Sequence, residues 1–348
     1  MKKILFSLLA LFLGLAASAQ TKWYEGYEMG LGGKILQTTN PYHRIDTVGY
    51  AFVGHEKNLV ICSGGLTLHF KTNSRNIRLD PEYGYIYPGR TTNQLAVMGF
   101  DIYIREGKKW LWAGAAVQKP GREDRPVTIV SDMDGTEHEC LIYLPMYSEL
   151  RSLKVGLDEG STMIPCGPSS KYSVVFHGSS FTMAVSASRS GMGYPMQFGR
   201  YTGLNVLGLG MSGNCKLQPA FAQALADAKF DALVLDTFSN PTVEQIKERL
   251  FPFIETIQAA HPANRSFSSG PSTGKTATST RNWTPSKPSA SRFRIPSWPL
   301  PASVTRMSIT SIPTQPRRTT RVRWTAPIPE TTVTTSGSSP LKRRCSKS

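Results

Sequence analysis

The chain has 348 residues, enough for two domains, and a formal net charge of +16 at pH 7. Such a charge would favour a nucleic-acid partner if it were spread over a folded surface. It is not, because residues 263–348 hold 15 Lys and Arg against one acidic residue, Glu330, and the remainder is nearly neutral. The distribution therefore argues against nucleic acid.

Residues 1–19 have the three parts of a secretory signal. Lys2 and Lys3 precede an apolar run at 4–15, and the small residues Ala-Ser-Ala at 17–19 form a cleavage site. We expect a protein exported to the periplasm or secreted, beginning near Gln20. No later apolar run is long enough for a transmembrane segment.

Residues 20–168 predict a β domain. Short apolar or alternating runs recur between Gly, Pro, Asn and Asp. The predicted strands are 58–61, 66–70, 100–104, 141–144 and 152–155. Many short strands of this kind predict a β-sandwich or jelly roll.

Residues 169–262 predict a second, α/β domain, so the fold class is α+β with two domains. Strands at 172–176, 205–209 and 232–235 alternate with helices. The predicted helices are 194–201, 216–228 and about 241–260. This alternation indicates a parallel sheet covered by helices on both faces. Three strands bury little apolar surface, so the domain is incomplete at its C-terminus.

The five cysteines fit no metal-binding pattern, and neither a metal nor an organic cofactor is expected. Buried, unpaired thiols are the favoured interpretation. An oxidising compartment would also permit a disulfide, whose pairing the sequence does not specify. The cysteines are Cys62, Cys140, Cys166, Cys215 and Cys345.

Three predicted strand ends carry groups that suit acyl transfer. Ser180 closes a Gly-Ser-Ser sequence after the first strand, Gly213 follows the second and Asn240 follows the third. The carboxyl ends of parallel strands meet at one edge, where a hydroxyl nucleophile and fixed N–H donors would lie together. Each residue also has an alternative, purely structural interpretation. Ser180 would belong to a Gly-Ser turn, Gly213 would allow a tight turn, and Asn240 would cap the helix that begins near Pro241.

Over about residues 24–262, five motifs in order resemble the SGNH/GDSL hydrolase superfamily, in particular a bacterial branch with an N-terminal β domain. They are Gly-Phe-Asp-Ile-Tyr at 99–103, Gly-Ser-Ser at 178–180, Ser-Arg-Ser-Gly-Met-Gly-Tyr-Pro at 188–195, Leu-Gly-Met-Ser-Gly-Asn at 209–214, and 236–242, which opens with Asp236 and contains Asn-Pro-Thr.

The resemblance implies a flavodoxin-like α/β/α domain behind a jelly roll. It implies Ser180 as the nucleophile, and an oxyanion hole made by the N–H groups of Ser180 and Gly213 with the Asn240 side chain. Gln218 stands where the branch would have Glu. A larger departure is the absence of the family's Asp-x-x-His block, since no His follows His261.

The printed residues 263–348 are rich in Ser, Thr, Pro and basic residues, which predicts a disordered tail. A second hypothesis is a frameshift near 262–263. In the shifted frame the single codon of Trp324 forces Asp, and the following codons allow Gly-Thr-His, while 263–272 allow a buried strand. A genuine cell-surface tail is the alternative, and DNA across these codons distinguishes the two.

Two functions follow. The first is an exported serine esterase that cleaves carboxylic esters through an acyl-enzyme, with acetyl groups on carbohydrate as a candidate substrate. The chain lacks the family's Asp-x-x-His block, and a serine hydroxyl without such a base is a poor nucleophile. The second is a non-catalytic carbohydrate-binding or scaffold protein of the cell envelope. The ester substrate and the oligomeric state are not encoded in any recognisable motif.

Overall fold

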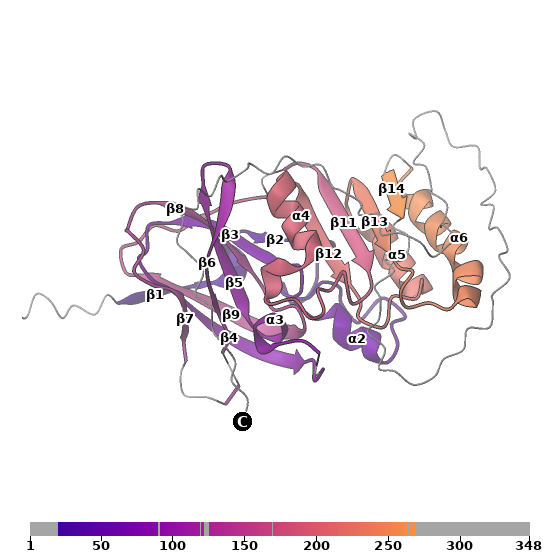
Figure 1. The fold of residues 1–348 in the computed structure, drawn as a ribbon, viewed down its shortest axis with the longest axis horizontal. Coiled ribbons are helices and arrows are strands. Elements are labelled where there is room, and N and C mark those ends of the chain that lie inside the picture. Colours follow the sequence, from indigo (N-terminus) through magenta and orange to yellow (C-terminus); the bar gives the residue numbers. More distant parts are fainter. Residues whose placement is uncertain are drawn as a thin grey trace, which may run out of the picture. The chain divides into compact units, whose positions relative to one another are not determined.

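The computed structural model describes residues 20–89, 91–118, 120–121, 125–168, 170–262 and 265–268 (Figure 1). The signal predicted at 1–19 and most of the predicted tail lie outside the described residues. Within the described ranges, none of the helices is long and apolar enough to cross a membrane.

The N-terminal region is a sandwich of two antiparallel sheets. One sheet has the order β1-β9-β4-β7, and the other has the order β10-β3-β8-β5-β6, with β2 paired to β3. The strands are β1 (Thr21–Glu25), β2 (Leu31–Gly32), β3 (Thr67–Thr72), β4 (Ile77–Ile86), β5 (Phe100–Glu106), β6 (Lys109–Ala116), β7 (Val127–Val130), β8 (His138–Tyr143), β9 (Ser148–Asp158) and β10 (Ile164–Pro165). The helical turns of this region are η1 (Gly26–Glu28), α2 (His55–Val60) and α3 (Gln94–Val97).

The predicted β-sandwich is confirmed, with one local error. Residues 58–61 were expected to form a strand, but they lie at the end of α2. An apolar run of four residues does not distinguish a buried strand from a buried helix turn, and here Leu59 and Val60 are both fully buried on a helix.

The C-terminal region holds a parallel sheet of order β12-β11-β13-β14. The first strand in sequence lies between the second and the third, as in the order 2-1-3-4-5 of flavodoxin-like sheets. The strands are β11 (Ser173–Gly178), β12 (Asn205–Gly210), β13 (Ala232–Asp236) and β14 (Arg265–Ser268), and the helical elements are η2 (Ser190–Met192), α4 (Tyr194–Thr202), α5 (Pro219–Asp227) and α6 (Val243–Ala260).

Helices cover both faces of this sheet, as the alternation predicted (Figure 1). Phe176 of β11 contacts the rings of Tyr194 and Phe198 on α4. The next residue, His177, points to the opposite face, where its ring contacts Phe221 of α5 and Phe253 of α6. Successive strand residues alternate between faces, so β11 separates two helix layers.

Strand β14 lies beyond the boundary predicted at residue 262. It pairs with β13 in parallel, from Ala232 opposite Arg265 to Leu235 opposite Ser268. The sheet therefore has a fourth strand in the printed chain, inside the segment that was expected to be an irregular tail. The remainder of that segment lies outside the described residues.

A hydrophobic core joins the two regions. It contains Phe52, Leu59 and Tyr147 from the β region together with Leu209 and Phe221 from the α/β region. The rings of Phe52 and Phe221 lie 4.9 Å apart. A second core lies between the two sheets of the sandwich and includes side chains from β3, β4, β5, β8 and β9.

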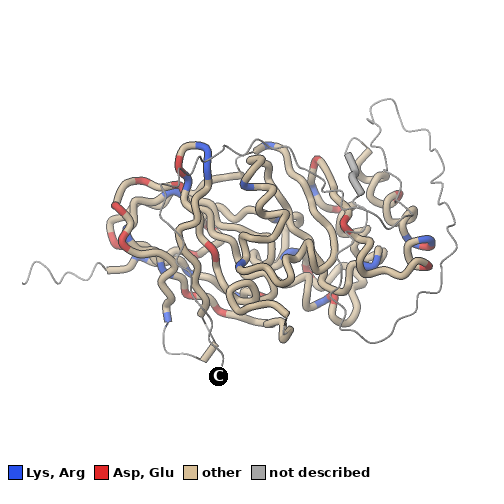
Figure 2. Tube along the Cα trace, in the orientation of Figure 1, with Lys and Arg blue, Asp and Glu red and all other residues tan. Residues whose placement is uncertain are grey.

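Basic and acidic positions are interspersed along the described backbone (Figure 2). Several form ion pairs on the sandwich, such as Arg78 with Asp158 at 3.1 Å and Arg125 with Asp80. The excess positive charge of the sequence lies in residues 263–348, most of which are outside the described ranges.

Candidate active site

The carboxyl ends of three adjacent strands carry the residues predicted from the sequence. In the sheet register, Gly178 of β11 lies opposite Gly210 of β12 and Asp236 of β13. Ser180, Gly213 and Asn240 each follow within a few residues of those ends. The sheet topology thus brings the three predicted loops to a single edge.

The loop that begins at Ser179 presents Ser180 to solvent. Ser179 is fully buried and its backbone N–H donates to the Asp236 carbonyl at 3.1 Å, whereas Ser180 is partly exposed. The Ser180 carbonyl accepts from the Val185 N–H at 2.8 Å. Its hydroxyl forms no hydrogen bond with any described residue, so it is open to a substrate.

The neighbouring loop, 211–215, is fixed to β11 and to the loop that follows β13. Its Met211 N–H donates to the Gly178 carbonyl at 2.8 Å, and its Cys215 N–H donates to Asn240 Oδ1 at 3.3 Å. Gly213 has a φ of 71° and is exposed. Because Asn240 accepts through its oxygen, its amide Nδ2 keeps two donors for a ligand.

Two glycines allow the strand ends to approach closely. A Cβ on Gly178 would lie 2.0 Å from Thr182 Oγ1, and one on Gly210 would lie 2.2 Å from the Met183 backbone nitrogen. Neither position has room for a side chain. The loop after Ser180 therefore packs directly on the two strands that flank it.

A hydrogen-bonded group at the end of β13 holds the same loop. Asp236 Oδ2 accepts from Thr182 Oγ1 at 2.8 Å and from the Tyr194 hydroxyl at 3.1 Å. Burial raises the pKa of the Tyr194 hydroxyl, which stays a neutral donor. The Asp236 motif was singled out in the sequence, but this bracing role was not predicted.

The β region also reaches this loop through Asp101, in the Gly-Phe-Asp-Ile-Tyr sequence of β5. The carboxylate is fully buried and accepts from the Gly191 N–H at 3.0 Å, from Arg189 Nε at 3.1 Å and from Trp112 Nε1 at 2.8 Å, with the Tyr103 hydroxyl at 3.2 Å. Burial raises the pKa of Asp101, and the Arg189 charge and the donors oppose that shift. The sequence motif at 99–103 contains Asp101, but its partners on the Ser180 loop could not be predicted because they are distant in sequence.

A buried arginine of the β region supports β12. Arg44 donates to the Gly210 carbonyl at 2.9 Å and to the Leu59 carbonyl. Burial lowers its pKa to about 10, because no carboxylate within the described ranges pairs with it. Its charge is held by backbone carbonyls, one of which ends the strand before Gly213.

His177, the histidine nearest to Ser180 in sequence, is not available as a base. It is fully buried, with Nδ1 at 3.1 Å from the Leu209 carbonyl and Nε2 at 3.5 Å from Cys215 Sγ. Burial lowers its pKa to about 4. Its ring points into the helix layer and not to the exposed face of the loop.

The other five histidines, all in the described ranges, are engaged elsewhere. His43, His69 and His138 contact the carboxylates Glu149, Glu139 and Asp134 respectively. His55 contacts tyrosine rings, and His261 lies 2.9 Å from the Leu225 carbonyl. Across the described part of the chain, no histidine is hydrogen-bonded to Ser180.

An aromatic group of the β region lies beside the Gly213 loop. The Tyr147 hydroxyl donates to Ser212 Oγ at 3.5 Å, its ring is 5.1 Å from Tyr87, and His55 is 5.7 Å from Tyr87 and 6.2 Å from Tyr85. Tyr85, Tyr87 and His55 are partly exposed. We call these four residues the aromatic wall.

Cys62, Cys140 and Cys215 are buried and Cys166 is partly exposed, all as free thiols. Burial raises the pKa of Cys62 to about 12, so it is an unreactive neutral thiol. Cys345 lies outside the described residues. Within the described ranges no group of three or more His, Cys, Asp or Glu side chains could hold a metal ion.

A serine on a loop at the carboxyl ends of the strands of a flavodoxin-like sheet is the arrangement of one class of hydrolases. Residues 21–163 match the N-terminus of SGNH-hydrolase-type esterases, and residues 171–266 match the GDSL-like lipase/acylhydrolase family. A search of curated proteins gives no match.

Two solved structures are similar to this chain. The chain is 34% identical to a GDSL-like lipase from Bacteroides ovatus, covering 72% of this chain and 74% of that one, with a TM-score of 0.68. A salicylyl-acyltransferase of a tetracycline biosynthetic pathway shares the fold at 19% identity, covering 72% of each chain, with a TM-score of 0.55. The chain belongs to the GDSL-like lipase/acylhydrolase family.

Proposed function

We propose that the protein is an exported serine esterase in which Ser180 is the nucleophile. The observation that carries this proposal is the partly exposed Ser180 hydroxyl, which has no described hydrogen-bond partner, at the edge of the sheet where the Gly213 and Asn240 loops also lie. In the reaction, Ser180 Oγ attacks the ester carbonyl and loses its proton to a base. The C–O bond to the alcohol then breaks, and water releases the acyl group from Ser180.

The backbone N–H groups of Ser180 and Gly213, with Asn240 Nδ2, form the proposed oxyanion hole. The exposed glycine leaves its N–H uncovered, and the bond from Cys215 to Asn240 Oδ1 orients the amide. Donors fixed before the reaction stabilise the negative charge of the tetrahedral intermediate without reorganisation.

The chain does not provide the base that would take the Ser180 proton. His177 is buried, and the other five histidines contact groups away from Ser180. We propose that a frameshift near residues 262–263 has replaced an Asp-x-x-His block. The chain with the printed residues 263–348 then binds esters and turns them over poorly. DNA sequence across these codons tests the frameshift directly.

We propose an acetylated carbohydrate as the substrate, since the aromatic wall offers partly exposed rings next to the Gly213 loop. Tyrosine rings pack well against the apolar faces of sugars while their hydroxyls bond to water or ligand. The signal predicted at 1–19 supports export to the periplasm or out of the cell, where cell-envelope glycans occur.

The test is covalent labelling by a fluorophosphonate, followed by peptide mapping. The purified chain with the frame corrected after Pro262 should be modified at Ser180, and Ser180→Ala should remove the label, while Ser186→Ala, on the same loop, should keep it. Labelling of Ser179 instead would move the nucleophile by one residue. No labelling of a folded sample would reject the esterase.

The second candidate is a non-catalytic carbohydrate-binding protein. It is favoured because none of the histidines is hydrogen-bonded to Ser180, while the aromatic wall offers a surface for a sugar. It predicts binding of acetylated xylo-oligosaccharide without labelling of Ser180. Loss of binding in Tyr87→Ala, with Ser180→Ala unchanged in affinity, would support it over the enzyme.

A further inference from the structure

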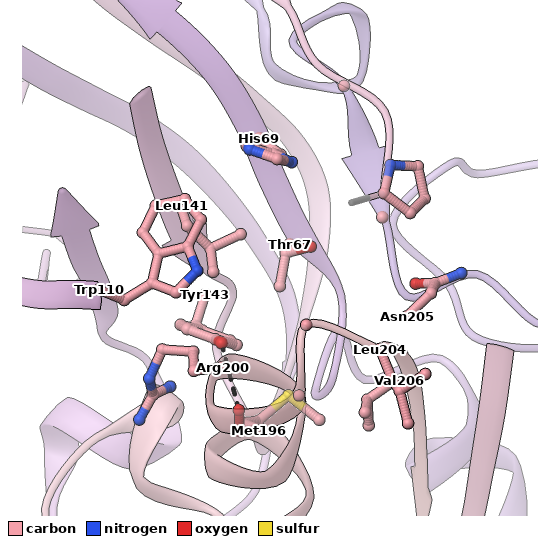
Figure 3. Close-up of a pocket in the computed structure, with 15 residues that line it drawn as sticks. Thr67, His69, Trp110, Leu141, Tyr143, Met196, Arg200, Leu204, Asn205 and Val206 are labelled. Atoms are coloured by element: carbon pink, nitrogen blue, oxygen red, sulfur yellow. Dashed lines mark hydrogen bonds between the residues drawn. The ribbon is translucent and has the colours of Figure 1, made fainter. Parts of the chain in front are cut away.

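A second pocket lies away from Ser180, where the sandwich meets the start of β12. Thr67 and His69 of β3, Trp110 of β6, and Arg200 of α4 line it, with Asn205 at the first position of β12 (Figure 3). Ser180 follows the carboxyl end of the sheet, whereas Asn205 begins a strand. The two sites therefore lie at opposite ends of the parallel strands.

The walls of the pocket are apolar and aromatic. Leu141, Met196 and Val206 contribute aliphatic surface, and Trp110 lies partly exposed beside them. The Trp110 ring is held in place by the His69 ring at 5.7 Å and by the Arg105 guanidinium at 5.5 Å. An oriented, accessible indole is a surface on which a sugar ring can pack.

Arg200 supplies a positive charge to the pocket. Its guanidinium lies 4.0 Å from the centre of the Tyr103 ring and 5.1 Å from that of Tyr143, and Nη1 donates to the Gly191 carbonyl at 2.6 Å. No carboxylate of the described residues lies within ion-pair distance of it. Stacking fixes the plane of the guanidinium, so its remaining N–H groups are preorganised to bind an anion.

Other polar groups of the pocket are also unused. Neither the Thr67 hydroxyl nor the Asn205 amide is hydrogen-bonded to another described residue, while His69 Nε2 bonds Glu139 at 2.8 Å. Glu139 itself is paired with Arg105 at 3.2 Å, which leaves Arg200 as the uncompensated charge. Figure 3 shows Arg200, Trp110 and Tyr143 on one side of the pocket and Asn205 on the other.

The size of the pocket limits what can enter. The pocket has a volume of about 80 Å³ and is open to solvent on one side. A carboxylate can therefore bind inside it while its sugar ring lies at the mouth against Trp110. Arginine binds carboxylates through two parallel hydrogen bonds, and hydroxyl and amide groups complete such a site.

We propose that this pocket is an accessory glycan site for an acidic sugar, a uronic acid whose carboxylate binds Arg200 while its ring packs on Trp110. The site is independent of Ser180 and goes beyond the proposed esterase. It would hold an acidic glycan on the protein irrespective of catalysis.

The test measures binding of a glucuronic-acid disaccharide and its neutral glucose counterpart to the purified full chain by calorimetry. The acidic sugar should bind at least tenfold more tightly, a difference of about 1.4 kcal/mol. Arg200→Gln should remove this preference and Arg200→Lys should keep part of it. The control Arg151→Gln, an exposed arginine of β9, should have no effect.

Trp110→Ala should weaken the binding of both sugars, and Ser180→Ala should leave the affinity for both unchanged. Equal affinity of the wild-type chain for both sugars, or no binding of either, overturns the proposal without any variant. An acidic preference that survives Arg200→Gln in a folded sample also overturns it. The outcome does not depend on whether Ser180 is catalytic.

Discussion

The two loops that meet at the candidate active site are held in different ways. The loop 211–215 is fixed mainly within its own sheet, through Gly178 and Asn240. The loop 179–193 is held near Ser180 by Asp236 of its own sheet and farther along by the β region. There Asp101 binds Arg189 and Gly191, and Asn93 Nδ2 donates to the Ala187 carbonyl at 2.9 Å. The far half of the loop thus depends on a part of the chain that supplies no reacting atom.

The Ser180 loop also needs that external support more than its neighbour. Ala184 and Ser186 have φ values of 62° and 61°, a conformation that costs non-glycine residues about 1 kcal/mol or more each. In the other loop the positive φ is at Gly213, where it carries no such cost. Both strained residues lie in the loop that the β region contacts at Ala187, Arg189 and Gly191.

The largest effect is expected from restoring the base. A chain with the frame corrected after Pro262 should hydrolyse an aryl acetate faster than the printed chain by roughly 10⁴-fold, the usual consequence of supplying a missing member of a Ser-His-Asp triad. Initial rates with both chains, each checked for folding by circular dichroism, measure the effect.

The restored chain should lose this activity in Ser180→Ala. Equal turnover by the two chains would contradict both the frameshift and the missing-base interpretation. Activity that persists in Ser180→Ala would show that another residue is the nucleophile, with Ser179 the first alternative.

The next effect concerns the β-region support. Asp101→Asn leaves Arg189 partly buried without its anion and should lower the free energy of unfolding by about 3 kcal/mol, as for other broken buried pairs. Urea denaturation measures it. The matched control is Asp80→Asn, whose pair with Arg125 is 36% and 46% exposed and should contribute less than about 1 kcal/mol.

The double variant Asp101→Asn/Arg189→Met should recover part of the loss, because it removes the unpaired charge as well. If Asp101→Asn lowers the free energy of unfolding no more than Asp80→Asn does, the Asp101 carboxylate does not stabilise the loop 179–193. The comparison between the two loops would then be wrong.

A smaller, pH-dependent effect is expected from His177. Burial lowers its pKa from 6.5 to about 4, so between these values the unfolded chain binds a proton that the folded chain does not. The contribution of neutral His177 to the free energy of unfolding is therefore complete above pH 6.5. It decreases by about 3 kcal/mol as the pH falls toward 4.

His177→Gln should flatten the pH dependence of unfolding over this range relative to the wild-type chain, and His55→Gln, at a partly exposed position, should not. Parallel curves for the wild-type chain and His177→Gln would mean that His177 is accessible to water in the folded state.

Much of the fold could be predicted from local patterns. The strands of the parallel sheet were predicted because apolar runs such as 232–235 lack alternation, as is typical of strands covered on both faces, and their order along the chain put Ser180, Gly213 and Asn240 at one edge. By contrast, β4 and β6 were missed. In β6 the residues Leu111 and Trp112 are both exposed, so the strand has no alternating pattern.

The supports of the site could not be predicted in the same way. Asp101 meets Arg189 across 88 residues of sequence, and Arg44 meets Gly210 across 166. These pairs depend on how the sandwich packs against the parallel sheet, which no local periodicity encodes. The motif containing Asp101 marked the residue as notable without identifying what it binds.

The core that contains Phe52, Tyr147, Leu209 and Phe221 crosses the sequence boundary near residue 169. A cut at that boundary would expose apolar surface on both fragments and leave Arg44 and Asp101 without their partners. The two segments that match separate families should therefore unfold in one cooperative transition. For the evolution of this chain, it follows that the sandwich is not an exchangeable module, and any recombination of the two parts has to preserve their shared interior.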